Sequence, residues 1–241
     1  MSTLLSLDKK PFDIVMSYVD INARYILSTF VPRCAHYETL LAMTDLCTYA
    51  LSHNNLVLME WAVKNSYDYL LAQREAVKSN RLDILKVMKD AGACIDVCVP
   101  QIAGLLKYFD ILRWCHSIGM KFDCVTTSNV ASSGHLGMLI WLREVGAEWS
   151  ITVCHHAAAS NDTMMLRWLL SHSAPFDMMA VVVAAENGHL EALQMLWAAW
   201  LRLAKGDVWP WDWKRVHAIA IKFNFIPVII WIRETDPEFA F

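Results

Sequence analysis

Apolar side chains recur along the chain with a period of about 27 residues. The first series is rich in tryptophan and contains Trp61, Val87, Trp114, Trp141, Trp168, Met195 and Trp231. A second series precedes it by five residues and contains Leu56, Leu82, Phe109, Leu136, Thr163, Leu190 and Ile226. A third series follows the second by three residues and contains Met59, Leu85, Leu112, Leu139, Leu166, Leu193 and Ile229. Several series that share one period predict internal repeats, each of which is one supersecondary unit.

Two further series locate the elements inside each repeat. Pairs of small or slim residues precede the second apolar series by six and five positions: Ala50-Leu51, Ala76-Val77, Ala103-Gly104, Val130-Ala131, Ala157-Ala158, Ala184-Ala185 and Ala220-Ile221. A turn series follows the apolar run and contains Asn65, Gly92, Gly119, Gly146 and Ser173. The small pairs predict a short first helix that neighbouring helices can approach closely. The turn series predicts a left-handed residue at the end of a longer second helix.

The remaining positions complete the repeat. Polar residues of the second helix concentrate at positions +1, +4 and +7, so most of its circumference is apolar, as expected for a helix sandwiched between copies of itself. Tight links, Gly134-His135 and Gly188-His189, separate the two helices. Aromatic-acidic segments such as Phe122-Asp123 and Phe176-Asp177 supply an Asp that caps the next helix or closes the turn. Because neither helix is long enough to persist alone in water, the repeats are expected to stack into an all-α solenoid of about seven helix-turn-helix units.

The best-defined repeats resemble a known family. AAENGHLEAL (Ala184 to Leu193) resembles the core of the ankyrin repeat, and SSGHLGMLIWLREVGAEW (Ser132 to Trp149) is a looser copy. The pattern is most similar to the short 27-residue ankyrin-like repeats of large DNA viruses and several protist groups, and the resemblance covers roughly residues 48–233. The standard ankyrin period is about 33 residues. The residues that the shorter repeat lacks correspond to the β-hairpin finger of the standard repeat. Because the finger is missing, the resemblance implies binding on the concave surface of the short first helices.

The two ends and one insertion interrupt the repeats. Residues 1–46 do not fit the pattern and are interpreted as an N-terminal helical cap. A faint resemblance of residues 11–33 to an F-box, which would link the chain to a cullin-type ubiquitin ligase, is the alternative. The solenoid is assigned to residues 47–233, with an insertion near 197–208 that extends the second helix of its repeat, and residues 234–241 form a C-terminal tail.

Five tryptophans gather around the insertion: Trp197, Trp200, Trp209, Trp211 and Trp213. Packing of most of these rings under the longer loop is the favoured interpretation. A surface contact patch is the alternative, because Trp often anchors interfaces.

Composition narrows the class of protein. Hydrophobic residues make up 56% of the 241 residues and charged residues 19%, which excludes a disordered chain. The net charge of −3 gives no basic field for nucleic acid or anionic lipid. No secretory signal or membrane span is recognised, so an intracellular, cytoplasmic or nuclear, location is expected. The seven cysteines form no Cys-x-x-Cys pair and are expected to be reduced and mostly buried.

Catalytic and metal-binding patterns are few. Cys154-His155-His156 is the one cluster of catalytic type, and adjacency in sequence does not place an imidazole against a thiolate. Phosphate-binding loops and zinc-ligand spacings are absent from the sequence. We therefore expect no enzyme activity, no cofactor, no metal site and no small-molecule substrate.

These expectations lead to one functional hypothesis. The chain is expected to be a non-catalytic scaffold that binds protein partners on the concave face of the repeats. The alternative is a substrate receptor that binds a ubiquitin-ligase adaptor through residues 11–33. From the family alignment, the predicted partner-binding residues are Lys78, Ser79, Leu105, Leu106, Ser132, Ser133, Ser160, Glu186, Asn187, Lys222 and Phe223.

Overall fold

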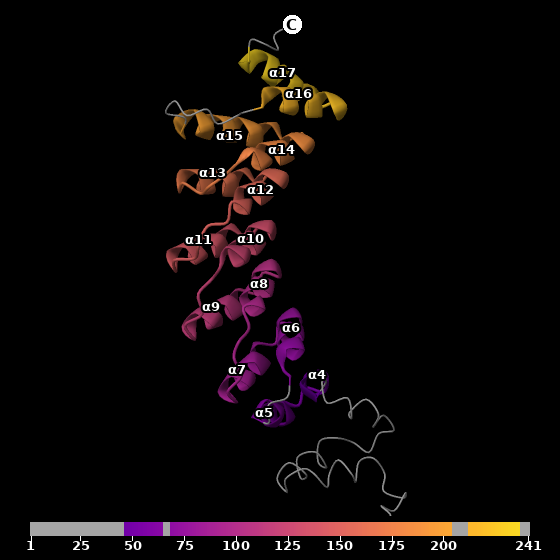
Figure 1. Cartoon of the computed structure of the whole chain (residues 1–241), viewed down its shortest axis with the longest axis vertical. Helices are drawn as coiled ribbons and strands as arrows, with labels where there is room; N and C mark the ends of the chain where they lie inside the picture. Colours follow the sequence, from indigo (N-terminus) through magenta and orange to yellow (C-terminus); the bar gives the residue numbers. More distant parts are fainter. Residues whose placement is uncertain (1–45, 65–67, 204–211, 237–241) are drawn as a thin grey trace, which may run out of the picture. The chain divides into compact units, whose positions relative to one another are not determined.

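The computed structural model describes residues 46–64, 68–203 and 212–236 and contains only helices in these ranges (Figure 1). Fourteen helices and no strand occur there, and they form seven consecutive pairs. The expected all-α solenoid of repeated helix pairs is confirmed. The predicted cap, residues 1–46, lies outside the described residues except for Leu46, which begins the first described helix, and the F-box-like segment lies wholly outside them. The last five tail residues, 237–241, are also outside the described residues. The three-part division of the chain therefore stays a prediction.

The described residues form two compact units, one up to Val99 and one from Pro100 onward. The first unit contains α4 (Leu46–Ser52), α5 (Leu56–Lys64), α6 (Leu70–Lys78) and α7 (Leu82–Asp90). Helix α8 (Cys98–Leu105) crosses the boundary between the units. Within the first unit, α4 packs on α5 and α6, and α7 packs on α5 and α6.

The second unit continues the alternation of first and second helices. Its helices are α9 (Phe109–Ser117), α10 (Cys124–Ser132), α11 (Leu136–Glu144), α12 (Thr152–Ala159), α13 (Thr163–Ser171), α14 (Met178–Glu186), α15 (Leu190–Leu203), α16 (Trp213–Lys222) and α17 (Ile226–Thr235). The first helices α10, α12, α14 and α16 follow one another along one side, and α11, α13 and α15 lie along the other (Figure 1). These four first helices also pack on the second helices of their own pairs, α11, α13, α15 and α17.

The helix boundaries follow the sequence period. All seven second helices begin at the residue of the second apolar series, from Leu56 in α5 to Ile226 in α17. Helix α15 has fourteen residues, whereas α13 has nine. The extension lies where the insertion was expected. Residues 204–211, which include Trp209 and Trp211, lie outside the described residues.

Left-handed residues end the helices as the turn series predicts. Gly92, Gly119, Gly146 and Ser173 have φ between 56° and 103°, and Asn65 lies outside the described residues. The turns inside the pairs have the same form. After α14, the N–H of Gly188 donates to the Ala185 carbonyl at 3.1 Å and the N–H of His189 donates to the Ala184 carbonyl at 2.9 Å. These two hydrogen bonds define the Schellman motif. The motif needs a positive φ at the residue after the C-cap, here Gly188, and therefore favours Gly or Asn at that position.

The core lies between successive helix pairs. Residues Leu112, Leu139, Leu166 and Leu193 of the third series are fully buried. The small pairs, such as Ala157-Ala158 and Ala184-Ala185, are also fully buried. The tryptophans of the first series are only half-buried, at the outer edge of this core. Between successive pairs, the apolar residues of these series are thus covered by the neighbouring pair, as stacking requires.

Candidate protein-binding surface

The predicted partner-binding residues lie at one repeated place, the C-terminal end of each first helix. In the first unit these are Lys78, the last residue of α6, and Ser79, its C-cap. In the second unit they are Leu105, Leu106, Ser132, Ser133, Ser160, Glu186, Asn187, Lys222 and Phe223. All of these residues are exposed except Ser133, which is half-buried. We call the nine residues of the second unit the first-helix surface.

Each position of the first-helix surface is followed by a backbone turn of fixed geometry. The next residues along the chain, Lys107, Gly134, Asn161, Gly188 and Asn224, have φ between 53° and 73°. The Schellman turns fix the direction of the helix end that precedes them. The surface is therefore carried by well-defined backbone and not by long loops.

The chemistry of the first-helix surface changes along the second unit. Its beginning is apolar, with Leu105 50% and Leu106 37% exposed. Its middle is uncharged and polar, and the hydroxyls of Ser132 and Ser160 donate to carbonyls of their own helices at 2.8 and 2.9 Å. Burial, with neighbouring His155 adding, lowers the pKa of nearby His156, which keeps that imidazole neutral at pH 7.

The far end of the surface combines charge with an aromatic ring. The Asn187 side chain donates to the Val183 carbonyl at 2.8 Å, beside the exposed carboxylate of Glu186. On α16, the Lys222 ammonium lies 5.0 Å from the centre of the Phe223 ring, and that ring is 47% exposed. A large apolar side chain exposed at this fraction is suited to contact with a partner.

Beside this surface, polar contacts connect successive first helices, and the sequence analysis missed them. The Gln101 amide donates to the Asp123 carboxylate at 2.7 Å, and the His155 ring Nε2 lies 2.6 Å from the Asp177 carboxylate. Both contacts join residues 22 positions apart, and both aspartates are the N-caps of the following first helix. Each Asp thus caps its own helix and accepts a bond from the helix before it.

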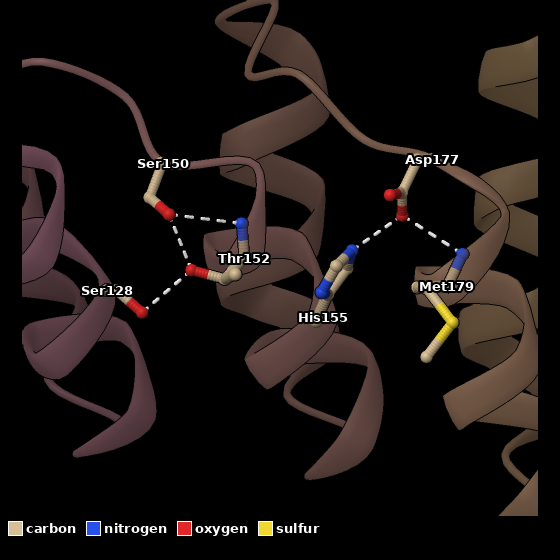
Figure 2. Close-up of polar contacts among 6 residues, drawn as sticks. All are labelled: Ser128, Ser150, Thr152, His155, Asp177 and Met179. Carbon is tan, nitrogen blue, oxygen red and sulfur yellow. Dashed lines mark hydrogen bonds and ion pairs between the residues drawn. The ribbon is translucent and has the colours of Figure 1, made fainter.

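The repeat between these two uses hydroxyls at the equivalent positions. Thr152 donates to the Ser128 hydroxyl at 2.7 Å and lies 2.5 Å from the Ser150 hydroxyl (Figure 2). Ser150 accepts from the Thr152 backbone N–H at 3.2 Å, while Asp177 accepts from the Met179 N–H at 2.9 Å (Figure 2). Asp96, Asp123, Ser150 and Asp177 are spaced by 27 residues, so the period of the apolar series could have located these capping positions.

The Cys154-His155-His156 cluster has the geometry of a structural element. Cys154 is fully buried, and burial, with Asp177 adding, raises the pKa of its thiol to about 12. A thiol with this pKa is protonated at neutral pH, whereas the thiolate is the nucleophilic form. His155 contacts Asp177, and the His156 ring lies 3.2 Å from the Ser128 hydroxyl.

The aromatic-acidic segments were expected to supply an Asp that caps the next helix. This role is confirmed for Asp123 at α10 and for Asp177 at α14.

The other expectations about chemistry concern metals, cysteines and membranes. Among the described residues, no group of three or more His, Cys, Asp or Glu side chains is placed to hold a metal ion. The cysteines in that part of the chain are free, and only Cys47, Cys115 and Cys154 are buried, so the expectation of mostly buried thiols is met by half of them. No described helix has the length and apolar character needed to cross a bilayer.

The described tryptophans of the insertion pack on one another. The Trp197 ring stacks on Trp200 at 4.8 Å between centres and meets Trp213 at the same distance. Trp213 in turn lies 5.4 Å from Trp231 of α17. The three insertion tryptophans are half-buried, which agrees with packing as their main role.

Comparison with known proteins agrees with this architecture. A family model described as ankyrin repeats (many copies) matches residues 154–196, which cover nearly all of α12, α13 and α14 and the first half of α15. No curated protein matches the sequence of the chain. The fold defines the class as an all-helical repeat protein, and residues 154–196 of it are similar to ankyrin repeats. Ankyrin repeats generally serve as protein–protein interaction modules and are typically not enzymes.

Proposed function

We propose that this chain is a non-catalytic scaffold that binds protein partners through the first-helix surface. The observation that supports the proposal most strongly is the exposure of Leu105 and Leu106 at the end of α8 and of Phe223 at the end of α16. An extended surface of this kind, built on a rigid stack of repeats, is how solenoid proteins contact their ligands.

The chemistry of the surface constrains the partner. Leu105 and Leu106 favour an apolar side chain of the partner, and Lys222 with Phe223 favours a carboxylate or a second aromatic ring. The neutral polar centre suits an uncharged segment that contributes hydrogen bonds at its edges. The partner is therefore proposed to be a protein segment, without a nucleic acid, cofactor or small-molecule substrate.

The setting of the scaffold follows from the same hypothesis. We place its action inside the cell, in the cytoplasm or nucleus, and assign its repeats to the short type that large DNA viruses and protists carry. The ubiquitin-ligase alternative depends on residues 11–33, outside the described residues. The purification described next also reports on it, because a ligase adaptor would be recovered with the bait.

The proposal is tested by affinity purification with mass spectrometry on three matched chains. The wild type is compared with the double variant Leu105→Glu, Glu186→Lys and with the control Met164→Glu, which alters an apolar side chain that is 69% exposed on a second helix. We expect the control to recover the wild-type partners and the double variant to lose them. Recovery of the same partners by a folded double variant would refute binding at this surface.

A further inference from the structure

A pocket lies between the turns that follow two successive second helices, α9 and α11, and we call it the turn pocket. Its volume of about 390 Å³ is within the range of pockets that hold small groups. Residues 119–122 and 145–148 form its two walls, and His116 completes the lining. Gly119 and Gly146 occupy the same repeat position and have φ of 82° and 83°. The two walls are therefore turns of the same geometry, one repeat apart.

The apolar part of the lining is aromatic and held in place by its own packing. Phe122 is 6% exposed, and its ring stacks on the His116 ring with 6.2 Å between centres. Both rings meet Trp141 of α11 edge-on at 5.7 Å. Half-buried Met120 and Val145 add aliphatic surface. Because the three rings support one another, the pocket offers a preformed surface to an apolar or aromatic group.

The two walls carry opposite charges. Lys121 and Glu148 occupy the same repeat position, 27 residues apart, and both are exposed. The neighbouring repeats have Cys94 and Pro175 at this position, so the combination is specific to this pair of turns. Within the described part of the chain, neither Lys121 nor Glu148 takes part in an ion pair. The pocket thus presents one ammonium and one carboxylate that a ligand can bind.

The combination of these two groups selects the polar group of the ligand. An ammonium only donates hydrogen bonds, and a carboxylate only accepts them. A ligand carboxylate would be repelled by Glu148, and a ligand cation would be repelled by Lys121. A hydroxyl both donates and accepts, so it can bond to both walls at once. A phenol adds a ring of the kind that packs against other rings, whereas the tryptophan N–H can only donate.

We propose that the turn pocket binds a tyrosine side chain of a protein partner, whose hydroxyl donates to Glu148 and accepts from Lys121. The inference rests on the proposed protein-binding function and adds a contact outside the first-helix surface. Tyrosine is enriched among the residues that dominate the binding energy of protein interfaces. A single side chain binds weakly when it is detached from its partner, so we expect a Kd on the order of millimolar for an isolated tyrosine derivative.

The test is a nuclear magnetic resonance titration of the whole 15N-labelled chain with N-acetyl-tyrosinamide, up to about 10 mM. The backbone amide signals of Gly119 and Gly146 report on the pocket. N-acetyl-phenylalaninamide has the ring without the hydroxyl, and free tyrosine tests whether the ligand is the amino acid itself. The pocket variants are Lys121→Met and Glu148→Gln. The matched control is Glu144→Gln, at an exposed carboxylate of α11 that does not line the pocket.

The proposal predicts saturable shifts of both glycine signals with N-acetyl-tyrosinamide in the wild type and in the Glu144→Gln control. Binding should be about tenfold weaker for N-acetyl-phenylalaninamide and for either pocket variant, because a hydrogen bond to a charged group is lost. Circular dichroism checks that all chains have the same helical content. Absence of saturable shifts in the wild type would overturn the proposal. So would equal affinity for the two blocked probes, unchanged binding by both pocket variants, or tighter binding of free tyrosine.

The titration also separates this proposal from the proposed function. The double variant Leu105→Glu, Glu186→Lys leaves the pocket residues unchanged, so it should bind N-acetyl-tyrosinamide as the wild type does. A wild type that recovers partners but does not bind the probe contradicts the turn pocket alone. A chain that binds the probe while the double variant recovers all partners contradicts the first-helix surface alone.

Discussion

In the second unit, the second helices and the first helices hold neighbouring repeats together by different means. The second helices share one buried leucine row, Leu112, Leu139, Leu166 and Leu193. The first helices are joined by polar contacts whose chemistry changes from repeat to repeat, an amide with a carboxylate, then hydroxyls, then an imidazole with a carboxylate. Close packing fixes side-chain volume at the leucine row, whereas a hydrogen bond needs only a donor and an acceptor at the right distance.

We therefore expect substitutions in the leucine row to lower the free energy of unfolding more than substitutions in the polar contacts do. Leu166→Ala removes a fully buried side chain and is expected to lower the free energy of unfolding by about 3 kcal/mol. Met164→Ala, at a side chain 69% exposed on the same helix, is expected to cost below about 0.5 kcal/mol. Denaturant unfolding followed by circular dichroism measures both variants. Equal losses would show that burial in α13 does not stabilise the stack.

The turns of the first helices give the next largest effect. Gly134 and Gly188 both have φ near +70°, a conformation that costs an alanine about 1 kcal/mol or more. A Cβ at Gly134 meets no atom within 4 Å, but a Cβ at Gly188 would lie 2.6 Å from the Phe225 ring. We expect Gly188→Ala to be clearly more destabilising than Gly134→Ala in the same unfolding measurement. The reverse order would contradict the close contact between Gly188 and Phe225.

Loss of a polar contact is expected to cost less free energy of unfolding than a truncation in the leucine row. Asp177→Ala removes the cap of α14 and the acceptor for His155, with an expected cost of about 1–2 kcal/mol. Asp177→Asn retains an acceptor oxygen and should cost less than half as much. Thermal and denaturant unfolding of the two variants measures the difference. An Asn variant as unstable as the Ala variant would show that the carboxylate charge is needed and that a neutral acceptor oxygen cannot replace it.

The smallest effect concerns pH. Because the pKa of His156 is lowered in the folded state, the unfolded chain binds its proton first as pH falls. Protonation of His156 does not affect the free energy of unfolding above the ordinary histidine pKa of about 6.5. Below that pH it destabilises the fold progressively. His156→Gln should therefore flatten the dependence of unfolding free energy on pH between about 7 and 5. An unchanged slope would mean that His156 titrates alike in both states.

The same contrast explains how much the sequence could predict. The apolar period located the starts of all seven second helices, because burial between repeats demands the same class of residue at Leu139, Leu166 and Leu193. The Gly and Asn turns were predictable for the same reason, since few residues tolerate a positive φ. Lys107, with a φ of 64°, does not follow this pattern and could not have been assigned from residue type.

The polar contacts were harder to predict because the residue types that form them differ from one repeat to the next. Gln101 and His155 occupy the same repeat position yet share no residue class, so a search for recurring residues passes over them. Among the residues of these contacts, the acceptors at the starts of the first helices, Asp96, Asp123, Ser150 and Asp177, preserve the period. The exposure of Ile221 also required the structure, since Val77, Ala158 and Ala185 at the same repeat position are fully buried.

The central claim, that partners bind the first-helix surface, is tested most directly by hydrogen–deuterium exchange of the chain with and without a captured partner. We expect slower exchange on binding at the helix ends and turns around Leu105, Ser132, Ser160, Glu186 and Lys222, with no change at the outer residues of α11 and α13. Protection confined to those outer residues, with unchanged exchange at the first-helix ends, would contradict it.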